Sequence, residues 1–300
     1  MHLPPPSANQ AYWDISAIDS GHIGGVLLGV LMDTVKDDGR GDLPCLAFLL
    51  RHSRTGDPFL FDLGIRPDVE NLGDVLNLVS QMDMKLEGRD IPATLEKGGL
   101  SRADVRHILI SHIHFDHSGF PPAFPNAMFL VGAGSKPILE TQGPNFEGTM
   151  YSIDLPLERT TFLDPSGSTD TTGADWAPIG PFPRALDFYG DGSLYIVDAP
   201  GHMPGHLNVL VRTSPDGGWA FLAGDSAHDW QLLTGEAMVG HHHTFGCIHE
   251  DPAKAQETIE RVKALSEHPR VRVLLAHDVP FVNANAADAT GYWPDTVESL

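Results

Sequence analysis

Four short apolar segments of this 300-residue chain each end at a histidine or an aspartate. The segments are VRHILISH (105–112), LYIVDAPGH (194–202), WAFLAGD (219–225) and VRVLLAH (271–277). Their aliphatic and β-branched residues are typical of buried strands. Side chains at strand ends can converge on one edge of a sheet. The pattern therefore predicts a sheet protein whose polar site lies at its strand ends.

The rest of the chain alternates strand-like and helical patterns. Further strand-like segments are LAFLL (46–50), PFLFDLG (58–64), AMFLVG (127–132) and HLNVLVRT (206–213). A helix is predicted over 252–265, where Asp251-Pro252 supplies a cap and a first-turn proline, and residues 69–80 also have helical character. The alternation favours an α/β fold with the four layers of an αββα sandwich.

We expect one domain over residues 1–300, with an N-terminal extension at 1–20. The stretch near 141–185 is rich in Gly, Pro, Thr and Asp and shows little periodicity, so it is predicted to be a long loop.

Composition narrows the possible partners. The net charge of −21 disfavours binding to nucleic acid or to acidic lipid headgroups. No segment approaches the roughly 18 apolar residues of a membrane helix, and the first residues lack the layout of a secretory signal, so we expect a soluble, cytoplasmic protein. Because Cys45 and Cys247 are the only cysteines, a metal site must rely on His and carboxylate ligands.

The strongest motif is SHIHFDHSG (111–119), directly after an apolar segment. In an extended chain His112, His114 and Asp116 point the same way, and the turn that follows brings His117 round. Imidazole and carboxylate together suit zinc and similar divalent ions. The motif therefore predicts metal binding.

Three other segments carry further candidates. DAPGHMPGH contains His202 and His206, FLAGDS contains Asp225, and LLAHD contains His277. Each alone would be read as a polar loop residue, but four such strand ends favour metal ligands. They divide into two sets: His112, His114 and His202 around one ion, and Asp116, His117 and His277 around a second ion, with Asp225 as a bridge.

In this order the motifs resemble those of the metallo-β-lactamase superfamily. They are FDLG (61–64), HIHFDH (112–117), GHMPGH (201–206), GD (224–225) and AHD (276–278), so that the resemblance covers about residues 45–280. It implies the metallo-β-lactamase sandwich and selects His202 as the ligand of its motif, which leaves His206 a structural role. Met203 stands where the family usually has Thr.

Within the superfamily, HIHFDHSG resembles the N-acyl homoserine lactone lactonases, which are quorum-quenching enzymes with two metal ions. Asp225 argues against true β-lactamases, which lack the bridging aspartate. The 23 residues after His277 leave no room for the glutathione-binding domain of glyoxalase II, and the acidic charge disfavours ribonuclease Z. The resemblance also implies a homodimer.

His228 departs from the lactonase pattern. Lactonases commonly have a tyrosine three residues after the bridging aspartate, which binds the substrate carbonyl. In GDSAHD this position is His228. The imidazole could donate a hydrogen bond or protonate a leaving group, or it could simply support Asp225.

The resulting prediction is a dinuclear zinc hydrolase that opens a small-molecule lactone by attack of a hydroxide held between the two ions. Asp116 would accept the hydroxide proton and pass it to the leaving alkoxide, and His228 is a second catalytic candidate. Alternatives are a thioesterase or other carboxylic ester hydrolase, an oxygen-dependent iron enzyme, and a non-catalytic zinc-binding module.

Other side chains allow two interpretations. His241, His242 and His243, with His249 nearby, could form another metal site or a solvated loop at the entrance. Trp230 and Phe245, and the alternating Met82, Met84 and Leu86, could form an apolar wall for an acyl chain or simply pack in the protein.

Overall fold

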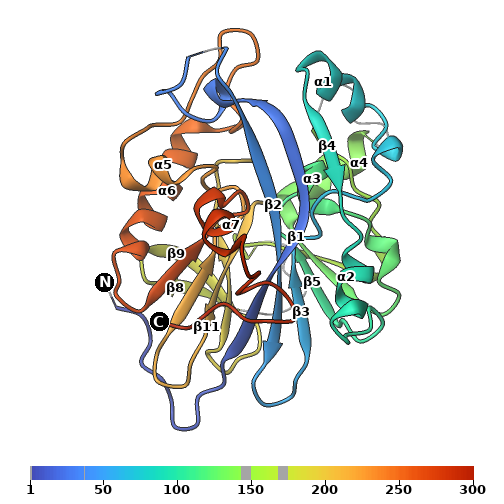
Figure 1. Cartoon of the computed structure of the whole chain (residues 1–300). Helices are drawn as coiled ribbons and strands as arrows, with labels where there is room; N and C mark the ends of the chain where they lie inside the picture. The colour runs from blue at the N-terminus through green and yellow to red at the C-terminus, as the bar shows by residue number, and fades with distance from the viewer. Residues whose placement is uncertain (1, 37, 143–149, 168–174) are drawn as a thin grey trace.

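Two β-sheets lie face to face, with helices on their outer faces, in the computed structural model of the chain (Figure 1). The structure describes residues 2–36, 38–142, 150–167 and 175–300. The first sheet has the strand order β4-β1-β2-β3-β5-β6-β7, and the second has the order β13-β12-β11-β10-β9-β8. Both sheets are mixed, because parallel pairs such as β5 with β6 and β12 with β13 stand beside antiparallel ones.

The strands are short apart from the first two. In the first sheet they are β1 (Trp13–Leu27), β2 (Arg40–His52), β3 (Pro58–Phe61), β4 (Lys85–Gly88), β5 (His107–Ile110), β6 (Met128–Gly132) and β7 (Thr160–Leu163). In the second sheet they are β8 (Trp176–Ile179), β9 (Phe182–Asp187), β10 (Leu194–Asp198), β11 (Leu207–Arg212), β12 (Trp219–Leu222) and β13 (Val271–Leu274).

The helices are α1 (Val75–Gln81), α2 (Ile91–Lys97), α3 (Phe115–Ser118), α4 (Lys136–Gln142), α5 (Trp230–Thr234), α6 (Pro252–Ser266) and α7 (Val279–Asn285). Figure 1 shows α5 and α6 on one side of the paired sheets and α2 and α4 on the other. Among the described residues, no helix is long and apolar enough to cross a membrane.

Alternation of side chains along the strands creates three packed layers of apolar residues. Between the sheets, Phe48 of β2 and Leu109 of β5 pack in one core with Ile196 of β10. On the outer faces, Leu95 of α2 packs against the first sheet and Val262 of α6 packs against the second. Central strands such as β3, β11 and β12 thus bury both of their faces, which requires four layers.

This arrangement confirms the predicted four-layer αββα fold. Every segment predicted to be a strand contains an observed strand, and the helix predicted over 252–265 is α6. The Asp251 side chain accepts the Lys254 N–H and caps this helix, as its sequence indicated. The helical pattern over 69–80 is divided into a 3₁₀ turn at Val69–Asn71 and α1.

Two segments without a predicted strand contain strands, and the long loop predicted near 141–185 was wrong. The expected N-terminal extension at 1–20 contains the first half of β1, which pairs with β2. The expected loop near 141–185 contains β7, β8 and the start of β9. Hydrogen bonds to neighbouring strands order these segments, and a local pattern of apolar residues does not reveal such pairing. Residues 143–149 and 168–174 of that stretch lie outside the described residues.

Close backbone packing fixes the loop that carries the GHMPGH motif. A Cβ atom added to Gly132, at the end of β6, would lie 2.0 Å from the carbonyl oxygen of Gly205. A Cβ atom on Gly134 would lie 2.5 Å from the Gly205 nitrogen. These glycines therefore let the end of the first sheet meet the loop that contains His202 and His206.

Substitution of Gly132 tests this packing. Its φ of −64° suits any residue, so Gly132→Ala adds only steric conflict, and we expect the free energy of unfolding to fall by about 1–3 kcal/mol. Urea denaturation of the metal-free protein measures the loss. Gly24→Ala is the matched control, since its added Cβ meets nothing nearer than 3.6 Å. Equal stability of the two variants would contradict the proposed close packing.

Candidate metal centre

The predicted ligands converge at the carboxyl ends of four strands. His112 and His114 follow β5, His202 follows β10, Asp225 follows β12 and His277 follows β13. The extended alternation expected for HIHFDH ends at His114, because Phe115–Ser118 form α3. This turn of helix carries Asp116 and His117 toward a separate position.

A first cluster contains three imidazoles. His112 Nε2 lies 2.9 Å from His114 Nδ1, and His202 Nε2 lies 3.2 Å from His112 Nε2 and 3.0 Å from His114 Nδ1. All three side chains are buried. Burial is the main cause that lowers the pKa of His112 and His202 well below its ordinary value, and that of His114 to about 4. Neutral imidazoles at this spacing offer three lone pairs to one cation.

A second cluster contains Asp116, His117 and His277. The Nε2 atoms of His117 and His277 lie 3.7 and 3.4 Å from Asp116 Oδ2. Burial lowers the pKa of both histidines, but Asp225 raises it and prevails, so that both pKa values lie well above the ordinary one. Without a metal ion, this cluster therefore holds protons where a cation would lie.

Asp225 joins the two clusters through its two carboxylate oxygens. Oδ2 lies 3.4 Å from His202 Nε2 and 3.6 Å from His112 Nε2. Oδ1 lies 3.1 Å from His117 Nε2 and 3.4 Å from His277 Nε2. Burial raises the pKa of Asp225, but the surrounding histidines lower it well below its ordinary value, so the bridging group is a carboxylate.

These side chains fit a pair of divalent cations. Asp225 Oδ1 and His117 Nε2 approach to 3.1 Å, yet both atoms are buried without a hydrogen bond among the described residues. Polar atoms are rarely buried in this way unless another group satisfies them. A shared ion would satisfy both atoms, and His and Asp side chains form groups of metal-ligating geometry around each oxygen of Asp225.

The non-ligating nitrogens of two histidines are held by residues outside the clusters. His117 Nδ1 lies 2.8 Å from the buried carboxylate of Asp62, which also accepts the N–H and the hydroxyl of Ser111. His277 Nδ1 lies 2.8 Å from the Pro44 carbonyl oxygen. Such partners fix the ring orientation of a metal-binding histidine. The FDLG motif contained the signal for Asp62, but its role was not predicted.

His206 and His228 lie beside the clusters. His206 Nδ1 lies 3.1 Å from the Ala199 oxygen and Nε2 lies 3.1 Å from the Asp225 backbone nitrogen, which is a structural arrangement. Burial lowers the pKa of His206 to about 3, so the ring stays neutral. His228 Nε2 lies 3.1 Å from Asp225 Oδ2, and His228 also lines the cavity described next. Both roles proposed for His228 remain predictions.

An apolar cavity of about 60 Å³ opens directly against the clusters. One side consists of His114, Asp116, Asp225, His228 and His277, and the other consists of Ile23, Val26, Val30, Leu31, Leu43, Met82, Met84, Phe115, Met150 and Ile248. Met82 and Met84 therefore lie in an apolar wall beside the clusters, as one of the two interpretations of that segment predicted. Leu86 packs with the same apolar cluster without lining the cavity.

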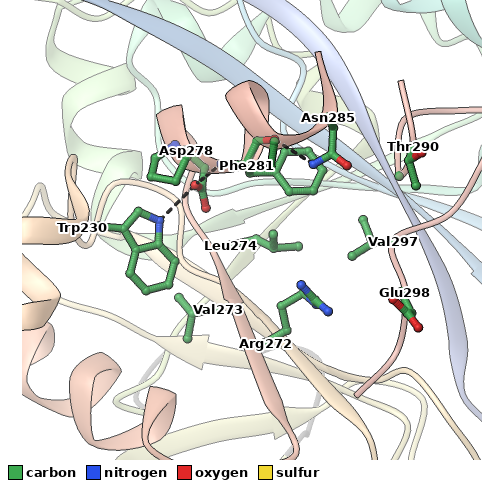
Figure 2. Close-up of a pocket in the computed structure, with 13 residues that line it drawn as sticks. Trp230, Arg272, Val273, Leu274, Asp278, Phe281, Asn285, Thr290, Val297 and Glu298 are labelled. Carbon is green, nitrogen blue, oxygen red and sulfur yellow. Dashed lines mark hydrogen bonds between the residues drawn. The ribbon is translucent and has the colours of Figure 1, made fainter. Parts of the chain in front are cut away.

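The other aromatic and histidine candidates lie elsewhere. Figure 2 shows Trp230 at the border of a different cavity, of about 300 Å³, where its indole N–H donates to Asp278. Phe245 is partly exposed and packs against His242. His241 and His243 are exposed, whereas His242 is buried, so the interpretation as a solvated loop does not hold for His242. His249 is separate from this run, because it is buried beside His202.

A family model described as the metallo-β-lactamase superfamily matches residues 40–229. The chain belongs to the metallo-β-lactamase superfamily. The matched range includes six of the seven predicted ligands, and His277 lies beyond it.

The chain is similar to several proteins of known name. It is 31% identical to the cytochrome P450 monooxygenase mpaDE' of Penicillium brevicompactum over 93% of its own length and 34% of that protein. It is 35% identical to the gamma-lactamase MBL2 of Gibberella moniliformis, with 56% of this chain and 70% of that protein covered. It is 30% identical to the N-acyl homoserine lactonase AttM of Azorhizobium caulinodans, with 65% and 66% covered.

The chain spans about a third of the length of the first of these relatives. Among solved structures, a quorum-quenching N-acyl homoserine lactone hydrolase matches with a TM-score of 0.67 and 17% identity, over 97% of this chain and 100% of that one. This likeness shows that the two proteins share their fold.

Metal uptake should release protons, because the raised pKa values of His117 and His277 favour the protonated rings when no metal ion is bound. At neutral pH we expect about two protons per chain to be released on binding of Zn²⁺, and affinity to fall as the pH falls. Calorimetric titration in buffers of different ionisation enthalpy measures this number. His117→Asn should release about one proton fewer. Heats that do not depend on the buffer would contradict the prediction.

Proposed function

We propose that this chain is a dinuclear zinc hydrolase that opens the ring of a small lactone. The observation that carries the proposal is Asp225, which directs one buried oxygen toward His112 and His202 and the other toward His117 and His277. A structural zinc site is normally closed by four protein ligands, whereas a bridged pair with an adjoining cavity is suited to catalysis.

The predicted ligands would hold two ions. The first ion would be bound by His112, His114 and His202, and the second by Asp116, His117 and His277. Asp225 would be shared by both ions. When bound, two divalent ions supply a nucleophile derived from water at neutral pH and a Lewis acid for the carbonyl oxygen. Asp116 borders both the second cluster and the cavity, so its carboxylate is placed to accept a proton and to return it to the leaving oxygen.

The apolar wall indicates what lies beside the reacting carbonyl. Aliphatic and methionine side chains line it, so the substrate would place an apolar group there. The cavity of about 60 Å³ favours a short or compact group over a long acyl chain. Methionine side chains adapt readily to the shape of a ligand, and Met82, Met84 and Met150 give the wall this capacity.

A second candidate function is the opening of a γ-lactam ring. The observation that favours it is the 35% identity to a protein named gamma-lactamase, which is higher than the 30% identity to a protein named N-acyl homoserine lactonase. A lactam and a lactone present the same cyclic carbonyl and differ in the atom that leaves. Either ring would bring this carbonyl to the clusters, and only the protonation of the leaving atom differs between the two reactions.

A substrate panel tests the proposal. We expect zinc-loaded protein to hydrolyse γ-lactones faster than γ-lactams, acyl thioesters or linear esters, and metal-free protein to be inactive. Asp116→Asn should lower kcat by about 10²–10⁴ and should also reduce the zinc content, because Asp116 is both a ligand and a proton carrier. Equal lactone hydrolysis by metal-free and zinc-loaded protein would exclude the proposed chemistry. A preference for the lactam would select the second candidate.

The cavity wall should set the preferred substrate size. Met84→Ala enlarges the cavity, so we expect the ratio of kcat/KM for a bulky lactone to that for a small lactone to rise about tenfold. The same change should lower the free energy of unfolding by about 2–5 kcal/mol. Met128→Ala is a matched control, because Met128 is 38% exposed and lies outside the cavity. An unchanged ratio in Met84→Ala would place the substrate elsewhere.

A further inference from the structure

The segment Cys247–Asp251 packs against the loop that carries His202. The Glu250 N–H donates to the His202 carbonyl oxygen at 2.9 Å, and the Asp251 N–H donates to the Gly201 carbonyl oxygen at 3.0 Å. Glu250 also accepts a hydrogen bond from the hydroxyl of Tyr151, whose ring stacks on His114. On the other side of His249, the Ile248 N–H donates to the Val30 carbonyl oxygen at 3.3 Å. Hydrogen bonds before and after His249 therefore fix the position of this buried residue.

The two nitrogens of His202 have different partners. Nε2 lies within 3.2 Å of both other imidazoles of the first cluster, whereas Nδ1 lies 3.2 Å from His249 Nδ1. A neutral imidazole that offers a lone pair at Nε2 carries its proton at Nδ1. His202 Nδ1–H would then donate to His249 Nδ1, and the proton of His249 would lie at its Nε2.

We infer that His249 is a positioning residue for His202, which orients this ring and fixes its tautomer so that Nε2 faces the first cluster. This inference rests on the proposed role of His202 as a metal ligand. It assigns a function to a residue outside the seven predicted ligands, and a hydrogen bond to a non-ligating nitrogen is the usual means by which proteins orient such a ring.

The contacts of His249 support this assignment. Its bond to His202 is the one hydrogen bond found for its ring, since Nε2 is buried without a partner among the described residues. The ring meets that of His202 edge-on, with centroids 5.1 Å apart and an interplanar angle of 83°. No stronger bond competes for the ring, so its orientation serves His202.

The partner of His202 also differs in kind from that of His117 in the second cluster. His117 is held by the Asp62 carboxylate, whereas His202 is held by a neutral imidazole. A carboxylate raises the basicity of the ring that it holds more than a neutral acceptor does. The first ion would therefore receive less electron density from His202 and would be the stronger Lewis acid, as suits the ion that polarises a carbonyl oxygen.

Two variants of nearly equal shape isolate this hydrogen bond. His249→Asn keeps an acceptor oxygen near the position of Nδ1, whereas His249→Leu has the same size and no acceptor. Chelator competition measures the affinity of each Zn²⁺ site, and the visible spectrum of Co²⁺-loaded protein reports ligand geometry. Thermal unfolding of the metal-free variants shows that both fold.

We expect His249→Leu to bind the first ion about 10–100-fold more weakly than wild type, with the second ion little affected and the Co²⁺ spectrum altered. His249→Asn should stay within a few-fold of wild type. Equal affinities and spectra in the two variants would overturn the inference.

Metal content of the wild type distinguishes the remaining outcomes. Two ions per chain is the expected result. Three ions per chain would overturn the inference, because His202, His228 and His249 would then form a metal site of their own. Wild-type protein that binds no divalent ion would overturn the proposed function itself, whatever the variants do.

Discussion

The structure around the metal centre depends on one buried carboxylate. Asp225 is 2% exposed and lies among imidazoles of both clusters, with one oxygen toward each. Burial of a charge is costly unless opposite charge and hydrogen bonds compensate it. The surrounding histidines, which lower the pKa of Asp225, provide that compensation, and the proposed cations would provide it when bound. Four strand ends must therefore meet at this carboxylate, and the backbone of β5, β10, β12 and β13 brings them there.

Residues outside the clusters determine how the imidazoles face this carboxylate. His206 connects the Ala199 carbonyl oxygen to the backbone nitrogen of Asp225, so the loop after β12 is tied to the loop after β10. Asp62 and Pro44 hold one histidine each from the first sheet. The two sheets are thus joined at the site by hydrogen bonds as well as by the apolar core, and the ligand geometry does not depend on the ions alone.

The sequence predicted the structure well where a local pattern of apolar residues determines it. It predicted the structure poorly where hydrogen bonds to a neighbouring strand determine it. Apolar segments that end in His or Asp predicted the strands and the convergence of the ligands, because strand ends share an edge. Residues 13–20 and β7 to β9 have no comparable pattern, since their order comes from neighbouring strands. His249 was also misplaced, because only tertiary contacts show that it lies against His202, 47 residues away in the chain.

Different parts of the chain supply the predicted metal-binding side chains and the wall of the cavity beside them. Strand ends supply the ligands, and a change in any strand that moves its ligand also disturbs the buried charge of Asp225. The apolar wall comes mainly from the end of β1, the start of β2 and the segment around Met82 and Met84, none of which carries a predicted ligand. Phe115, in the ligand motif, Met150 and Ile248 complete it. Substitutions at wall positions outside the HIHFDH motif can change the fit of the proposed substrate without replacing a ligand. Substrate preference is therefore the property of this chain that is least constrained by its fold.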